Sequence, residues 1–145
     1  MKPSIQFHYL SDQRFFFTRR KNLKQFLVGL FKKEGFSVEM VNYIFCSDNF
    51  LLNINQEFLQ DDRFTDIITF QLSDNAQPII SDIYISVDRI MHNSKSLAIS
   101  FKDELHRVIF HGALHLCGYN DKTDKEKIII HKKEDAYLSK YFRFT

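Results

Sequence analysis

Apolar residues recur along the chain with two periods, and each period predicts one kind of element. Alternating polar and apolar residues, or short runs rich in Ile, Thr and Phe, predict strands. Apolar residues spaced three or four apart predict helices that bury one face. The expected strands span 4–9, 37–46, 65–72 and 82–87, and the expected helices span 18–34, 48–58, 87–97 and 102–117, followed by a last helix that opens at 123.

Typical capping residues stand at the borders of these helices. A hydroxyl or carboxylate side chain before a helix accepts a free N–H of the first turn, and glycine ends a helix because it adopts a left-handed backbone. In the second helix, Phe50, Leu51, Ile54 and Phe58 would form the buried face. The expected caps are Thr18 and Asp48, the pairs Ser100–Asp103 and Thr123–Glu126, and Gly35 as the stop of the first helix.

Strands fill mainly the first part of the chain and helices dominate the rest, which favours an α+β fold. We expect a small mixed β-sheet packed with helices. With 145 residues, 44% of them hydrophobic and 26% charged, the composition is typical of one globular domain over residues 1–145. It excludes a disordered or fibrous chain.

Charge is distributed unevenly, although the net charge is only +2. Residues 1–33 hold eight Lys or Arg and one acid, so the first helix would present a basic surface compatible with a nucleic-acid partner, or simply a solvated lysine face. No signal-peptide core and no window of roughly 18 apolar residues is found, so we expect a cytoplasmic protein without a membrane span. Cys46 and Cys117 are too few for a disulfide framework and are expected to be reduced core thiols.

The segment HGALHLCGYND, residues 111–121, has the pattern of a metal site. His111 and His115 lie four residues apart on an expected helix, about 40° apart around its axis and about 6 Å apart along it, so both imidazoles can reach one ion. Gly118 suits the position after the helix end, and the turn that follows can return Asp121 to the histidine face. A catalytic zinc site needs three protein ligands and an open position, and these three side chains would supply the ligands.

The same segment reads H-G-x-L-H-L-x-G-Y and resembles the signature of the YbeY family, the metal-dependent endoribonucleases of ribosomal RNA maturation. FTDIITF at 64–70 and SDIYIS at 81–86 are similar to two strands of that family, in the same order. The resemblance covers most of the chain. It implies an α+β fold with the metal at the end of the H-x-x-x-H helix, a single zinc as the usual ion, cleavage of single-stranded RNA, and ribosomal RNA and ribosome-associated proteins as partners in ribosome quality control.

The chain departs from that family at two places. The family motif commonly ends in G-Y-D-H, and Asp121 occupies the position of that last histidine. A carboxylate can bind zinc, but its charge leaves the ion less electrophilic than three imidazoles would, so activity should rise further into the alkaline range. Where the family has an arginine after an L-N-x-x-[YF] helix, this chain has Leu59, and Arg63 is the nearest guanidinium that could take its role.

The residues beside the histidines bear on the reaction class. Zincin peptidases place a general-base glutamate directly after the first histidine, and Gly112 stands there instead, which disfavours peptide hydrolysis. A metal ion can itself activate water for phosphodiester hydrolysis. The candidate catalytic residues are Arg63, as a substitute for the arginine that the resemblance implies, and Asp66. Asp66 would handle a proton or orient a histidine, although loop ordering is the commoner role of such an aspartate. Cys117 lies on another helix face and is expected in the core.

Two other functions fit the same residues. The metal could be structural, in an RNA- or protein-binding module, but a structural zinc site takes four protein ligands and the sequence offers three good candidates. A metal-dependent hydrolase of another ester or amide class would share the same ligands. We expect a zinc-dependent endoribonuclease, with other first-row divalent metals as alternatives to zinc.

Overall fold

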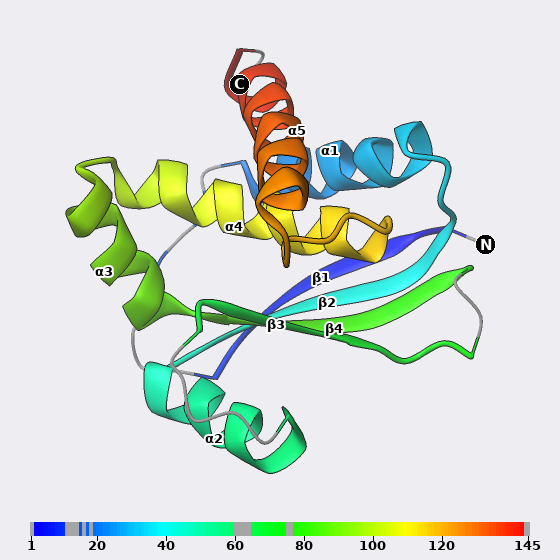
Figure 1. Cartoon of the computed structure of the whole chain (residues 1–145). Helices are drawn as coiled ribbons and strands as arrows, with labels where there is room; N and C mark the ends of the chain where they lie inside the picture. Colours follow the sequence, from blue (N-terminus) through cyan, green and yellow to red (C-terminus); the bar gives the residue numbers. More distant parts are fainter. Residues whose placement is uncertain are drawn as a thin grey trace.

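Four strands form one mixed sheet in the computed structural model, which describes residues 2–10, 15, 17, 19–59, 65–74 and 77–143. The strand order is β1–β2–β4–β3 (Figure 1). β1 (Ser4–Tyr9), β2 (Val38–Cys46) and β4 (Ile79–Ser86) run parallel, and β3 (Ile67–Gln71) pairs antiparallel with β4 at one edge. The expected α+β fold with a small mixed sheet is confirmed.

Helices cover the two faces of the sheet unequally (Figure 1). α1 (Arg20–Lys33), α4 (Phe101–Leu116) and α5 (Asp124–Arg143) lie over one face, and α3 (Val87–Leu97) joins β4 to α4. The main core lies between this face and these helices. α2 (Asp48–Leu59) lies against the opposite face of the sheet, and a smaller apolar cluster fills the space between them.

The expected caps of the later helices are present. Ser100 Oγ accepts the N–H of Asp103 at 3.0 Å, and Thr123 and Glu126 bond reciprocally at 2.9 and 3.1 Å. These bonds satisfy N–H groups that have no partner within the helix, so they fix where α4 and α5 begin.

Of the two expected caps of the earlier helices, one is wrong and the other lies outside the described residues. Ser47, not Asp48, caps α2, because its Oγ accepts the N–H of Phe50 at 3.1 Å. Asp48 is the first residue of that helix and its carboxylate binds Ser86 Oγ and Arg89 instead. α1 begins at Arg20, and the expected cap Thr18 lies outside the described residues.

The buried face of α2 also differs from the expectation. Leu51 is buried and Ile54 packs beside it, but Phe50 and Phe58 are 40% and 63% exposed. The apolar cluster beneath α2 is small, with Cys46, Leu51 and Ile68 as its buried members, and Asn55 is buried with Leu51 on this helix. An apolar pattern gives the period of a helix but does not tell how much sheet is available to cover it.

The two cysteines behave as expected. Both are free and buried, and burial raises the pKa of each thiol to about 12. Cys117 belongs to the main core and Cys46 to the smaller cluster under α2. Within the described ranges, no helix is long and apolar enough to cross a bilayer.

Candidate metal centre

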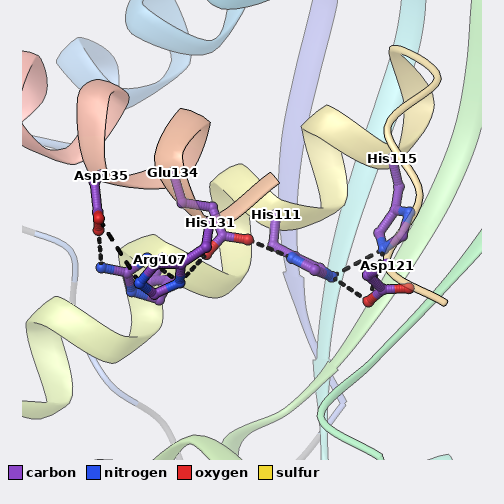
Figure 2. A network of polar contacts seen from close by, with 7 residues as sticks. All are labelled: Arg107, His111, His115, Asp121, His131, Glu134 and Asp135. Carbon is purple, nitrogen blue, oxygen red and sulfur yellow. Dashed lines mark hydrogen bonds and ion pairs between the residues drawn. The ribbon is translucent and has the colours of Figure 1, made fainter. Parts of the chain in front are cut away.

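α4 carries both histidines, and the ring of His111 meets Glu134 of α5 (Figure 2). His111 and His115 are one helical turn apart, and their rings are perpendicular to each other with centroids 4.4 Å apart. Their Nε2 atoms lie 2.9 Å apart. Figure 2 shows that both rings point toward the same carboxylate, that of Asp121.

The end of α4 explains how Asp121 returns to the histidines. Gly118 has a φ of +95°, a left-handed conformation that suits glycine. Its N–H donates to the carbonyl of His115 at 3.0 Å, and the N–H of Tyr119 donates to that of Leu114 at 3.1 Å. This pair of bonds is a Schellman motif, which stops the helix and reverses the chain. The expected glycine stop is therefore present, and the loop after it runs back beside α4.

The three ligand atoms form a small triangle. Asp121 Oδ2 lies 3.2 Å from His111 Nε2 and 3.4 Å from His115 Nε2. Ligand atoms about 2.0–2.1 Å from a tetrahedral zinc ion stand about 3.3 Å apart, so the triangle fits one ion of this kind. In the part of the chain that the structure describes, no other group of three His, Cys, Asp or Glu side chains is close enough to hold an ion.

A second carboxylate orients His111 through the ring nitrogen that faces away from Asp121. Glu134 on α5 contacts Nδ1 of His111 at 2.5 Å, which leaves Nε2 as the atom that faces the triangle. Burial disfavours the charged imidazolium, but the hydrogen bond and charge of Glu134 outweigh it and raise the pKa of His111. Because Glu134 stabilises positive charge at this ring, it also favours a cation at Nε2.

Glu134 is in turn held by Arg107 (Figure 2). The guanidinium donates to Glu134 Oε1 at 2.9 Å and to Asp135 at 2.5 Å, and it lies 3.3 Å from the ring of His131. Arg107, His111 and His115 are spaced by four residues along one stripe of α4. One face of this helix therefore carries two candidate ligands and the cation that balances the carboxylate of Glu134.

A cavity of about 270 Å³ lies beside the triangle. Its walls include Asp66, Glu104, His111 and Asp121. Burial raises the pKa of Asp66, and burial and the charge of Asp66 raise that of Glu104. Both carboxyls can therefore carry a proton closer to neutral pH than an exposed carboxyl can.

The remaining candidate residues have different outcomes. Asp66 lies just before β3 in the cavity wall, but Nδ1 of His111 is hydrogen-bonded to Glu134 and not to Asp66. Leu59 ends α2 and is 53% exposed. Arg63 lies outside the described residues. Asp66 and Arg63 therefore stay candidates for catalysis.

Gly112, the residue between the two histidines, faces the sheet. A Cβ atom there would lie 2.8 Å from Ile67 Cδ1 on β3 and 3.3 Å from Ile83 Cγ2 on β4. Glycine allows α4 to approach the strands closely. The absence of a glutamate after the first histidine thus has a steric reason in this fold.

Glu134 could have been found from the sequence by one signal. The buried residues of α5 are Ile130, Glu134, Tyr137 and Tyr141, at helical spacings of four, three and four. A glutamate within such an apolar stripe must have a partner, because an isolated buried charge is costly. The stripe alone does not name that partner, since it depends on how α5 docks against α4.

Glu134→Gln should weaken zinc binding by about 10- to 100-fold, the usual effect of losing a residue that orients a ligand. Glutamine keeps the shape of the side chain but removes the charge that stabilises His111. Asp135→Asn is the matched control, because Asp135 binds Arg107 but has no contact with His111 in Figure 2. Competition with a chromogenic chelator would measure both affinities. Equal affinity in wild type and Glu134→Gln would refute the role of Glu134.

The chain is similar to known proteins along most of its length. The family model described as Endoribonuclease YbeY matches residues 10–142. Curated proteins named Endoribonuclease YbeY from Cytophaga hutchinsonii and Karelsulcia muelleri are 46% and 40% identical, and the matches cover 96% and 90% of this chain and 97% and 92% of theirs. The solution structure of TM1509 from Thermotoga maritima matches with a TM-score of 0.65 and 29% identity over 95% of this chain and 89% of that one. The chain therefore belongs to the YbeY family of endoribonucleases.

Proposed function

We propose that this protein is a zinc-dependent endoribonuclease that cleaves single-stranded RNA. Its metal ligands are His111, His115 and Asp121. Its setting is ribosomal RNA maturation and ribosome quality control in the cytoplasm, where ribosomal RNA and ribosome-associated proteins are its partners. One domain over residues 1–145 carries the whole activity.

The observation that carries the proposal is the triangle of two imidazole nitrogens and one carboxylate oxygen beside a cavity. A structural zinc site is closed by four protein ligands, whereas a catalytic site keeps one position open. The cluster found among the described residues has three members, so a bound ion would keep a position for water or substrate. This favours catalysis over a binding module with a structural metal.

A bound zinc ion would supply Lewis acidity toward a phosphoryl oxygen and would activate water. The protein's own residues do the rest. Glu134 holds the ring of His111 so that Nε2 points into the triangle. Asp66 and Glu104, whose pKa values are raised by burial, are placed in the cavity wall to accept or release a proton during hydrolysis.

The basic first helix suits a polyanionic substrate. Arg20, Lys21, Lys32 and Lys33 of α1 are exposed. Contacts between such side chains and phosphates release counterions, so RNA binding should weaken steeply as salt rises. A hydrolase of small uncharged substrates would lack this salt dependence.

Removal of the metal tests the proposal. The purified protein should contain about one zinc per chain and should cleave a single-stranded fragment of ribosomal RNA. Treatment with a chelator should remove the zinc and abolish RNA cleavage. One equivalent of zinc should restore both the metal content and the cleavage, because the ligands lie in a domain whose core stays folded without the ion. Elemental analysis would measure the metal, and a denaturing gel would measure cleavage.

Three other outcomes would contradict the proposal in different ways. A zinc-loaded protein that binds RNA without cleaving it would be a binding module with a structural metal. Zinc-dependent hydrolysis of a small ester or amide, without cleavage of RNA, would indicate another hydrolase class. Full cleavage by the metal-free protein would exclude the metal from the reaction.

A further inference from the structure

Asp121 reaches the histidines on a short loop that has little regular structure. The Schellman motif fixes the chain as far as Tyr119, and the bonds between Thr123 and Glu126 hold the other end of the loop, but no helix or strand includes residues 120–123. The side chain of Asp121 is 42% exposed, against 20% and 24% for His111 and His115. Of the three ligands, Asp121 is therefore the least restrained by its own element.

Tyr119 ties this loop to a distant part of the chain. Its hydroxyl donates to Glu34 Oε1 at 2.8 Å, and Glu34 is the C-cap of α1, 85 residues away in the sequence. Glu34 Oε2 accepts a short hydrogen bond from the hydroxyl of Tyr137 on α5, and Lys133 of the same helix lies 3.5 Å away. One carboxylate thus joins the end of α1, the loop and α5.

The carboxylate suits this role because it is charged. Burial would raise the pKa of Glu34, but the hydrogen bonds from Tyr137 and Tyr119 and the charge of Lys133 outweigh it and lower the pKa. Hydrogen bonds to an ionised carboxylate are about twice as strong as those between neutral groups. Lys133 also places its ammonium 5.8 Å from the ring centroid of Tyr119, which further holds the ring in place.

We propose that Tyr119 is a positioning residue for the metal ligand Asp121. Its hydroxyl bond to Glu34 fixes the start of the loop two residues before the ligand, so that Oδ2 of Asp121 meets the two histidine nitrogens without first being ordered by the ion. The inference rests on the proposed metal site. Without the Glu34 bond, binding of the ion would also have to order the loop, and affinity would fall.

The chain contains a matched control. Tyr119→Phe and Tyr137→Phe each remove one phenol hydroxyl from the same carboxylate, but only Tyr119 lies on the loop. Zinc affinity, measured by chelator competition, should fall about 10-fold or more in Tyr119→Phe. In Tyr137→Phe the zinc affinity should stay within about twofold of wild type. This variant loses an ordinary hydrogen bond of α5, which does not hold the loop that carries Asp121.

Two further readouts separate positioning from loss of stability. The visible absorption spectrum of the Co²⁺-loaded protein reports ligand geometry and should change in Tyr119→Phe but not in Tyr137→Phe. Glu34→Gln should lower zinc affinity as well, and the double variant Glu34→Gln/Tyr119→Phe should lose no more than the greater single loss, because the two residues act through one bond.

The outcomes distinguish this inference from the proposed function. If wild type binds zinc and both tyrosine variants bind it equally well, the positioning role of Tyr119 is excluded while the metal site stands. If both variants lose affinity and unfolding free energy in parallel, the effect is general stability and the positioning role is again excluded. If wild type binds no zinc, the metal site and the positioning role both fail.

Discussion

Asp121→Ala should lose zinc and RNA cleavage together. Asp121 Oδ2 closes the triangle with His111 and His115, so alanine leaves two ligands on one helix. Zinc sites with four ligands bind with roughly 10–16 kcal/mol, or roughly 3 kcal/mol for each ligand, so affinity should fall on the order of a hundredfold. Elemental analysis and a cleavage assay on the same samples would measure both losses.

Two controls belong with this experiment. Asp124→Ala removes an exposed acid at the start of α5, outside the triangle, and should keep both zinc and cleavage. Asp121→His should keep zinc and shift the rate profile toward lower pH, since a neutral imidazole leaves the ion more electrophilic than a carboxylate does. If Asp121→Ala kept its zinc, the assignment of Asp121 as the third ligand would be wrong.

Much of this site could be predicted because its geometry is local. The spacing of His111 and His115 alone places two rings on one helix face. Gly118 indicates where the helix ends, since a left-handed residue at that point reverses the chain. Asp121 follows from the reversal. These three inferences need only helical geometry and short-range turn chemistry, and the structure brings the three side chains together.

The contacts of the supporting residues could not be predicted, because the partners are distant in sequence. Glu134 meets His111 across 23 residues, and Glu34 meets Tyr119 across 85. Both contacts depend on how α1 and α5 dock against α4, which no local pattern gives. The mistaken buried face of α2 has the same origin, since the extent of sheet beneath that helix depends on the tertiary structure.

Gly112→Glu, which would recreate the sequence of a peptidase helix, should destabilise the protein by at least about 3 kcal/mol. Gly112 is buried against β3 and β4, and even a Cβ atom would lie 2.8 Å from Ile67 Cδ1. A glutamate would add steric overlap and an unpaired buried charge at the same point. Urea unfolding followed by circular dichroism would measure the loss.

Gly29→Glu is the matched control, because Gly29 also lies within a helix but is exposed, and a Cβ atom there meets nothing within 4 Å. Glutamate is the better helix former, so this variant should be as stable as wild type or more stable by roughly 0.5 kcal/mol. The peptidase reaction should not appear in Gly112→Glu, since a side chain at this position points into the sheet. A Gly112→Glu protein as stable as Gly29→Glu would mean that α4 can move away from β3 and β4, and the steric explanation for the missing glutamate would then be wrong.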